Sequence, residues 1–197
     1  MKLRLRSKRS TAGFTLIELL VIIVIIGVMF AIAAPGWDAL LSRQRVSTAR
    51  EQVLQVLRQA QSEARSTHSY RAVVFDPNPS DGAPRVAILP FNGTGGYPIN
   101  LSTVTNWQPL AGGSNSRNVI SLRTNHPNNQ IIFDGNGAVA QPPIVPGNQF
   151  RAIPNSTEPG FAVTVARANT SGNATNRCVI IATLLGATRS AEGAACP

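Results

Sequence analysis

The sequence predicts an α+β protein in which one long N-terminal helix packs on an antiparallel β-sheet. Two observations predict this fold class. Residues 37–68 contain no Gly or Pro and are rich in Ala, Leu, Gln, Glu and Arg, a composition that favours helix. After Tyr70 the pattern changes to short apolar runs separated by turn residues. Consecutive strands without a helical pattern between them pair in an antiparallel sheet.

The first 35 residues combine a basic leader with an apolar run. Residues 1–13 contain five cationic side chains and no acidic one, whereas residues 14–35 contain eighteen apolar residues out of twenty-two and a single charge, Glu18. As a helix this run is about 33 Å long, enough to cross a bilayer core of about 30 Å. The cations lie on one flank, so the positive-inside rule places the N-terminus in the cytoplasm and the chain after Pro35 outside it.

A cleaved secretory signal is the alternative interpretation of this segment, because Ala31, Ile32 and Ala33 imitate an A-x-A cleavage site. The run is longer than the core of a usual signal, about 7 to 15 residues, and it holds a carboxylate near its start. We therefore expect the segment to be retained as a membrane helix.

Glu18 lies one helical turn inside the apolar run. An acidic side chain at mid-bilayer costs about 2.5 to 3.5 kcal/mol, so a carboxylate kept there marks a functional site. One interpretation is a carboxylate close enough to the interface to be hydrated. The other is a carboxylate whose partner is a cation of another subunit, supplied when helices bundle together.

The helix at residues 36–68 has an apolar face and a basic face. Seven apolar residues fall within an arc of about 100° that must cover a core: Val46, Ala49, Val53, Val56, Leu57, Ala60 and Ala64. Four arginines, named here the arginine stripe, fall on an adjacent arc of about 80°: Arg43, Arg50, Arg58 and Arg65. The stripe is a solvated face, a subunit contact or a phosphate contact. Pro35 and Gly36 are expected to kink or locally melt the helix where it leaves the membrane.

Six strands are expected in the C-terminal domain, residues 69–197. They are residues 71–75, 85–91, 118–123, 130–133, 161–166 and 178–183, with turns at 76–82, 93–96 and 135–137. The cysteines are Cys178, in the last of these strands, and Cys196. Outside the cytoplasm we expect a disulfide rather than two free thiols, and closing this loop contributes about 3 kcal/mol in the chain-entropy model.

A short motif lies at the junction of the leader and the apolar run: Gly13, Phe14, Thr15, Leu16, Ile17, Glu18, Leu19 and Leu20. With the basic leader before it and the apolar run to Pro35 after it, this motif resembles the signal of type IV pilins and type II secretion pseudopilins. The resemblance implies that a prepilin peptidase cuts after Gly13 and methylates the new N-terminus, Phe14. It also implies that Glu18 pairs with the N-terminal amine of a neighbouring subunit during filament assembly.

Two further stretches, residues 131–137 and the terminal strand pair at residues 177–189, resemble more weakly the H-type minor pseudopilins and FimT-type minor pilins (GspH/FimT). The resemblance implies the type IV pilin-like fold. It implies a single-pass protein of the bacterial inner membrane, with a cytoplasmic N-terminus and a periplasmic C-terminal domain, that later enters a filament. The implied partners are the prepilin peptidase, other pilin or pseudopilin subunits and the inner-membrane assembly platform.

Enzymatic function is not expected, and neither is a cofactor or a metal. No lysine follows Lys8, which excludes a Walker A loop and a Schiff-base lysine from the chain beyond the leader. His68 and His126 lack a metal-ligand spacing. Residues 76–82 faintly resemble a calcium loop, but the glycine is one place late and no Glu closes the loop, so we expect a proline turn.

The net charge of +9 suggests nucleic-acid binding. Much of this charge, however, lies in the leader, where it sets the orientation of the chain in the membrane. The leader holds five of the cations, and the chain after Pro35 carries thirteen arginines and eight acidic residues, a net charge of +5. We expect a structural subunit of a type II secretion pseudopilus or a type IV pilus, which use the same signal. The alternative is a DNA-binding minor pilin of a competence pilus. The resemblance implies a glycine- and arginine-rich terminal loop for such pilins, whereas residues 185–189 hold one arginine, Arg189.

Overall fold

The computed structural model describes residues 13–80, 82–93, 97–113, 119–141, 145, 151–152, 159–168, 172 and 175–196. Leader residues 1–12, residue 118 of the third expected strand and much of the expected turn at 93–96 lie outside the described residues. The chain divides into two compact units, Met1–Leu40 and Leu41–Pro197. One helix, α1 (Leu16–Thr67), contributes residues to both units.

A threonine caps the start of α1. The Glu18 N–H donates to Oγ1 of Thr15 at 3.3 Å, which satisfies a backbone donor of the first helical turn. The helix is continuous through Pro35 and Gly36, so it does not melt there, and the kink expected at this point stays a prediction. His68 follows the helix in the left-handed region, with a φ of 46°, a conformation that ends helices.

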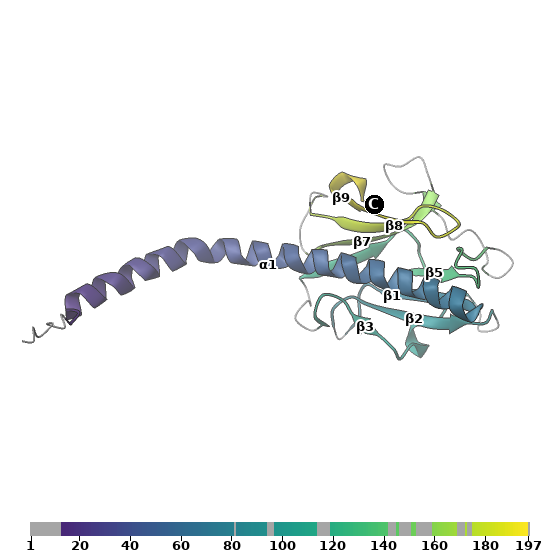
Figure 1. Cartoon of the computed structure of the whole chain (residues 1–197), viewed down its shortest axis with the longest axis horizontal. Helices are drawn as coiled ribbons and strands as arrows, with labels where there is room; N and C mark the ends of the chain where they lie inside the picture. The colour runs from purple at the N-terminus through teal and green to yellow at the C-terminus, as the bar shows by residue number, and fades with distance from the viewer. Residues whose placement is uncertain are drawn as a thin grey trace, which may run out of the picture. The chain divides into compact units, whose positions relative to one another are not determined.

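Four strands form one antiparallel sheet in the order β3-β2-β1-β5 (Figure 1). Their bounds are β1 (Tyr70–Asp76), β2 (Arg85–Phe91), β3 (Gln108–Pro109) and β5 (Gln130–Phe133). β1 is central and pairs with β2 along its whole length. A short helix, η1 (Leu101–Thr103), lies in the chain between β2 and β3.

The remaining strands form a second antiparallel sheet in the order β4-β7-β8-β9, and a short strand, β6, pairs with β7. Their bounds are β4 (Ile120–Thr124), β6 (Arg151–Ala152), β7 (Pro159–Arg167), β8 (Arg177–Ile181) and β9 (Thr188–Glu192). A second short helix, η3 (Gly193–Ala195), follows β9.

The structure confirms all six expected strands to within two residues at their ends, but it divides them between two sheets where one sheet was expected. β4 pairs with β7, far along the chain, whereas β5 pairs with β1. Hydrophobic alternation shows that a strand exists but not which strand it pairs with. β3 and β6 were not expected, because two residues are too few to form a pattern.

The core of the larger unit is built on the predicted apolar face of α1. All seven residues of that face are buried, none more than 5% exposed. They belong to one cluster with side chains from both sheets, including Phe75 and Phe133 of the first sheet and Phe161 and Val179 of the second. The amphipathic interpretation of residues 46–64 is therefore confirmed.

The turn after β5 packs against the last turns of α1. A Cβ on Gly135 would lie 2.8 Å from the backbone carbonyl carbon of His68. Gly137 has a φ of 75°, and a Cβ there would overlap the side chain of Arg65. Glycine is favoured at both places, at Gly135 because a side chain would meet the backbone of His68 and at Gly137 because a side chain is strained at a positive φ. The expected turn at 135–137 is confirmed.

Candidate assembly site

Two predicted site residues lie at the N-terminal end of α1: Phe14 just before the helix and Glu18 in its first turn. Phe14 is 76% exposed, and Glu18 is exposed as well. Within the part of the chain that the structure describes, no cationic group lies within 4.0 Å of the Glu18 carboxylate. The described residues therefore leave this carboxylate to water or to a partner that is not among them.

The helix after Glu18 exposes apolar side chains all round. Fourteen large apolar residues between Leu16 and Ile32 are exposed, from 41% at Ile22 to 83% at Leu16. A helix that is hydrophobic on every side is stable only when its surroundings are apolar. The predicted membrane segment continues to Pro35, and the side chains of residues 33–36 lie outside the described residues. Taken over the residues that are described, no helix combines the length and the apolarity needed to span a membrane.

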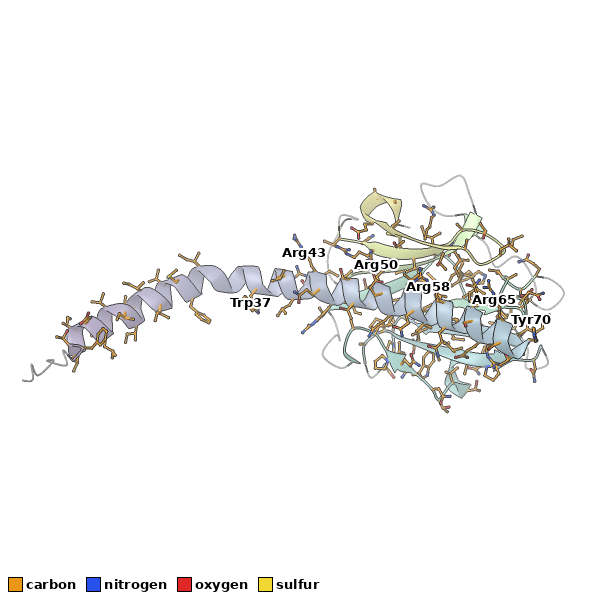
Figure 2. The ribbon with its side chains drawn as sticks, in the orientation of Figure 1. Trp37, Arg43, Arg50, Arg58, Arg65 and Tyr70 are labelled. Atoms are coloured by element: carbon orange, nitrogen blue, oxygen red, sulfur yellow. A yellow bond between two sulfur atoms is a disulfide. The ribbon has the colours of Figure 1, made fainter. Side chains whose placement is uncertain are left out.

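The arginine stripe follows α1 into the larger unit (Figure 2), but its members differ. Nη1 of Arg50 donates to Oε1 of Glu192 at 3.0 Å, and Nη2 donates to Oε1 of Glu51 at 2.5 Å. The Arg50 side chain is only 18% exposed. Two acidic groups of the same chain thus neutralise Arg50, so it offers little charge to an external phosphate.

Arg65 is also engaged within the domain, because its Nε donates to the backbone oxygen of Asn136 at 3.1 Å. Arg43 and Arg58 are exposed. Arg189 is exposed on β9, where it lies opposite Ile180 of β8. A DNA or subunit contact at these arginines stays a prediction, and Arg50 and Arg65 are each bonded within the chain.

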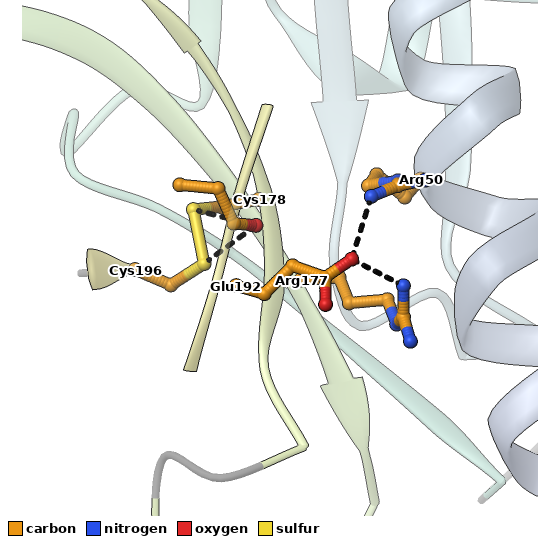
Figure 3. The surroundings of a disulfide bond; sticks show 6 residues. Arg50, Arg177, Cys178, Glu192 and Cys196 are labelled. Atoms are coloured by element: carbon orange, nitrogen blue, oxygen red, sulfur yellow. Dashed lines mark hydrogen bonds and ion pairs between the residues drawn. A yellow bond between two sulfur atoms is a disulfide. The ribbon is translucent and has the colours of Figure 1, made fainter. Parts of the chain in front are cut away.

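Cys178 and Cys196 form a disulfide, with Cα atoms 5.6 Å apart (Figure 3). Both residues are buried, and the two sulfur atoms lie 3.6 and 3.3 Å from the backbone oxygen of Ala191. The predicted disulfide is confirmed. It joins β8 to the residue after η3, and so encloses the whole of β9 in a covalent loop.

Beside the disulfide lies an ion-pair cluster that sequence reasoning missed. Oε1 of Glu192 accepts hydrogen bonds from Nη1 of Arg50 and from Nη1 of Arg177 (Figure 3). Arg177 and Glu192 are direct neighbours across β8 and β9. Pairing the two predicted terminal strands in this register is the one step that could have predicted their contact. Arg50 is 142 positions away from Glu192 in the chain, and no local pattern links them. The cluster ties α1 to the disulfide-bonded hairpin.

A second missed residue is Gln61 of α1, which contacts the turn after β5 and the turn after β8. Its Nε2 lies 2.7 Å from the backbone oxygen of Gly137 and 3.1 Å from that of Leu185, and donates to both. A glutamine in an amphipathic helix carries no sequence signal, because glutamine is also common on solvated faces. Its contacts place the turn after β5 and the turn after β8 against the same stretch of helix.

The N-terminal segment defines the chain as one with a prepilin-type signal. The prokaryotic N-terminal methylation motif matches residues 8–34. This match confirms the resemblance to type IV pilin-like proteins over those residues and includes Gly13, Phe14 and Glu18.

Among solved structures, the chain is similar to the type IV minor pilin FimU of Pseudomonas aeruginosa in two crystal forms. In space group P21 the identity is 14%, the match covers 77% of this chain and 96% of FimU, and the TM-score is 0.47. In space group P65 the corresponding values are 16%, 74%, 91% and 0.43. No curated protein matches the chain significantly.

Proposed function

We propose that the chain is a structural subunit, a minor pilin or pseudopilin, of a type IV pilus or a type II secretion pseudopilus. The observation that carries the proposal is the methylation motif at residues 8–34, with Glu18 in a stretch of helix whose large apolar side chains are exposed. Apolar surface of this extent requires lipid or other helices to cover it. A filament of bundled helices supplies that cover.

In this proposal a prepilin peptidase removes the basic leader by cutting after Gly13 and methylates the amine of Phe14. The helix at 14–35 then holds the subunit in the bacterial inner membrane as a single pass. The cationic leader keeps the N-terminus in the cytoplasm, and the domain after it lies in the periplasm. An assembly platform in the same membrane moves the subunit into the growing filament.

In the proposed assembly step, Glu18 forms an ion pair with a neighbouring subunit. An isolated carboxylate or ammonium group costs several kcal/mol in an apolar environment, whereas a paired one is compensated. We propose that the Glu18 carboxylate accepts hydrogen bonds from the N-terminal amine of Phe14 in a neighbouring subunit. Each group neutralises the other, so both can remain in the apolar interior of the helix bundle.

The test is the variant Glu18→Val in the full chain. We expect normal cleavage after Gly13 and normal membrane retention, with incorporation into sheared filaments reduced at least about tenfold, a loss of about 1.4 kcal/mol. The matched control is Glu63→Gln, a carboxylate of the same helix that lies in the packed region. Immunoblots of membranes and of purified filaments measure both steps. Wild-type incorporation of Glu18→Val would contradict the pairing mechanism.

The finer assignment within this class is an H-type minor pseudopilin or a FimT-type minor pilin, and its role is structural rather than enzymatic. Support comes from residues 131–137 and 177–189, which form the helix-packed turn and the disulfide-bonded hairpin. Flanking genes distinguish the two filaments. Secretion components with no retraction motor favour a pseudopilus, and twitching or competence genes favour a pilus.

A further inference from the structure

Two leucines differ from the other large apolar residues described after Leu41. Among the described residues after Leu41, only Leu184 and Leu185 are exposed large hydrophobic side chains, at 50% and 77%. They lie at the tip of the turn between β8 and β9. Single exposed leucines are common on protein surfaces, but two adjacent leucines at a turn tip form a compact apolar projection, named here the leucine tip.

Hydrogen bonds within the turn fix the shape of the leucine tip. The Gly186 N–H donates to the backbone oxygen of Thr183, and the Ala182 N–H donates to that of Ala187, each at 2.9 Å. Oγ1 of Thr183 accepts from the Ala187 N–H at 3.1 Å. The turn is therefore closed by both backbone and side-chain groups.

The rest of the domain holds the turn in place. The backbone oxygen of Leu184 accepts from the Val139 N–H at 2.7 Å, and that of Leu185 accepts from Nε2 of Gln61 at 3.1 Å. Gly186 is buried with a φ of 80°, and a Cβ on it would overlap Gln61. Polar groups of the turn thus bond to the domain while the leucine side chains remain exposed. A projection ordered before binding loses little conformational entropy when it binds.

The charged residues near the leucine tip are mostly cationic. Arg65 bonds to Asn136 in the adjoining turn, and Arg189 follows the tip by four residues; both are exposed. Asp134 is half-buried in that turn, and its Oδ1 accepts from the Asn136 and Ala138 N–H groups. An apolar centre with charged residues around it is the usual anatomy of a protein–protein interface.

Charge also indicates the kind of partner. The chain after Pro35 carries a net charge of +5, so the net charge of a second copy has the same sign as the arginines near the leucine tip. Electrostatic complementarity requires a partner with carboxylates at the matching positions. Leucine side chains require an apolar pocket between them. These two requirements together favour a different, more acidic chain over a second copy or nucleic acid.

We propose that the leucine tip docks into an acidic-rimmed apolar pocket on the globular domain of a different pilin-like subunit in the same filament. This inference rests on the proposed function, because it takes the partner from the filament. It assigns to the β8–β9 turn the choice of neighbour, whereas Glu18 serves the helix bundle that every such subunit shares.

The test replaces Leu185 with a photo-crosslinking amino acid in the full-length chain, expressed in a host that makes the filament. The matched control carries the same amino acid at Gln55, an exposed position of α1. We expect a light-dependent adduct from position 185, but not from position 55, with one other pilin-like subunit, and mass spectrometry locates the crosslink on that subunit. Adding Leu184→Asp should reduce the adduct at least about tenfold, because the new carboxylate repels the acidic rim.

A cooperative thermal unfolding transition of each purified variant shows that it is folded, and Leu184→Ser replaces Leu184→Asp if the latter is not. An adduct with a second copy, with nucleic acid or with lipid overturns the proposal. So does the absence of an adduct from chains recovered in filaments, which leaves the proposed function intact. Chains that are processed but never enter filaments count against both proposals.

Discussion

The two halves of α1 use apolar residues in different ways. Between Leu16 and Ile32 the large apolar side chains are exposed on every side of the helix, whereas between Val46 and Ala64 they form one stripe and are buried. The second half is an amphipathic helix whose partner is its own domain. The first half has no such partner among the described residues. One continuous helix can therefore carry two kinds of apolar surface. One is buried when the domain folds, and the other stays exposed until lipid or other helices cover it.

A matched pair of charge substitutions tests this comparison with the largest expected effect. Val53→Asp places a carboxylate at a fully buried position, and we expect it to lower the free energy of unfolding by about 3 to 5 kcal/mol. Val24→Asp lies in the exposed half at 56% exposure. It should leave domain stability within about 0.5 kcal/mol and reduce membrane retention instead.

Urea denaturation in detergent, followed by near-ultraviolet circular dichroism, measures the first effect, and membrane fractionation measures the second. Val24→Ile serves as the conservative control in both assays. Equal destabilisation of the domain by Val24→Asp and Val53→Asp would contradict the division of the helix into two functional halves.

Removing the disulfide sharpens the comparison, because the bond lies in the domain against which the second half of α1 packs. Replacing both cysteines, Cys178→Ser with Cys196→Ser, should lower the free energy of unfolding by about 3 kcal/mol, because the unfolded chain regains the entropy of a loop of this size. Cleavage after Gly13 should be unchanged. Thermal denaturation of the variant, with oxidised wild-type protein as the reference, measures the effect. A variant as stable as the oxidised wild type would show that the loop closure contributes nothing.

The smallest expected effect is at the ion-pair cluster that joins α1 to the hairpin. Glu192→Gln removes the carboxylate shared by Arg50 and Arg177. Because Glu192 is 55% exposed, we expect a loss of stability of no more than about 1 kcal/mol. A double-mutant cycle with Arg50→Gln isolates the pair, and its coupling energy should fall further in high salt. A coupling energy of zero at low salt would mean that the cluster does not hold the hairpin to the helix.

The parts of the fold that could be predicted from the sequence are those with a local pattern. The face from Val46 to Ala64 follows the helical period, and the strands at 85–91 and 130–133 are bounded by turn residues, so each is found where it was expected. The motif from Gly13 to Glu18 is local as well, and the methylation motif matches it. Short-range physics decides all of these features.

What could not be predicted depends on residues far apart in the chain. The division into two sheets is decided by the pairing of β4 with β7 and of β5 with β1, and alternation gives no information about such partners. Helical spacing placed Arg50 on the arginine stripe but gave no sign of its partner Glu192, which is 142 positions away in the chain. Gln61 was overlooked because its two carbonyl partners belong to turns that tertiary folding brings together.

The composition of the core also bears on the order in which the chain can fold during synthesis. The apolar face of α1 is made early, but it is buried partly by Val179 and Ile181 of β8, which leave the ribosome well over a hundred residues later. Contacts of such long sequence separation form slowly and leave apolar surface open in the meantime. Until β8 has been made, the face from Val46 to Ala64 is incompletely covered. During this stage both halves of the helix expose apolar side chains. Productive folding of the growing chain therefore competes with aggregation.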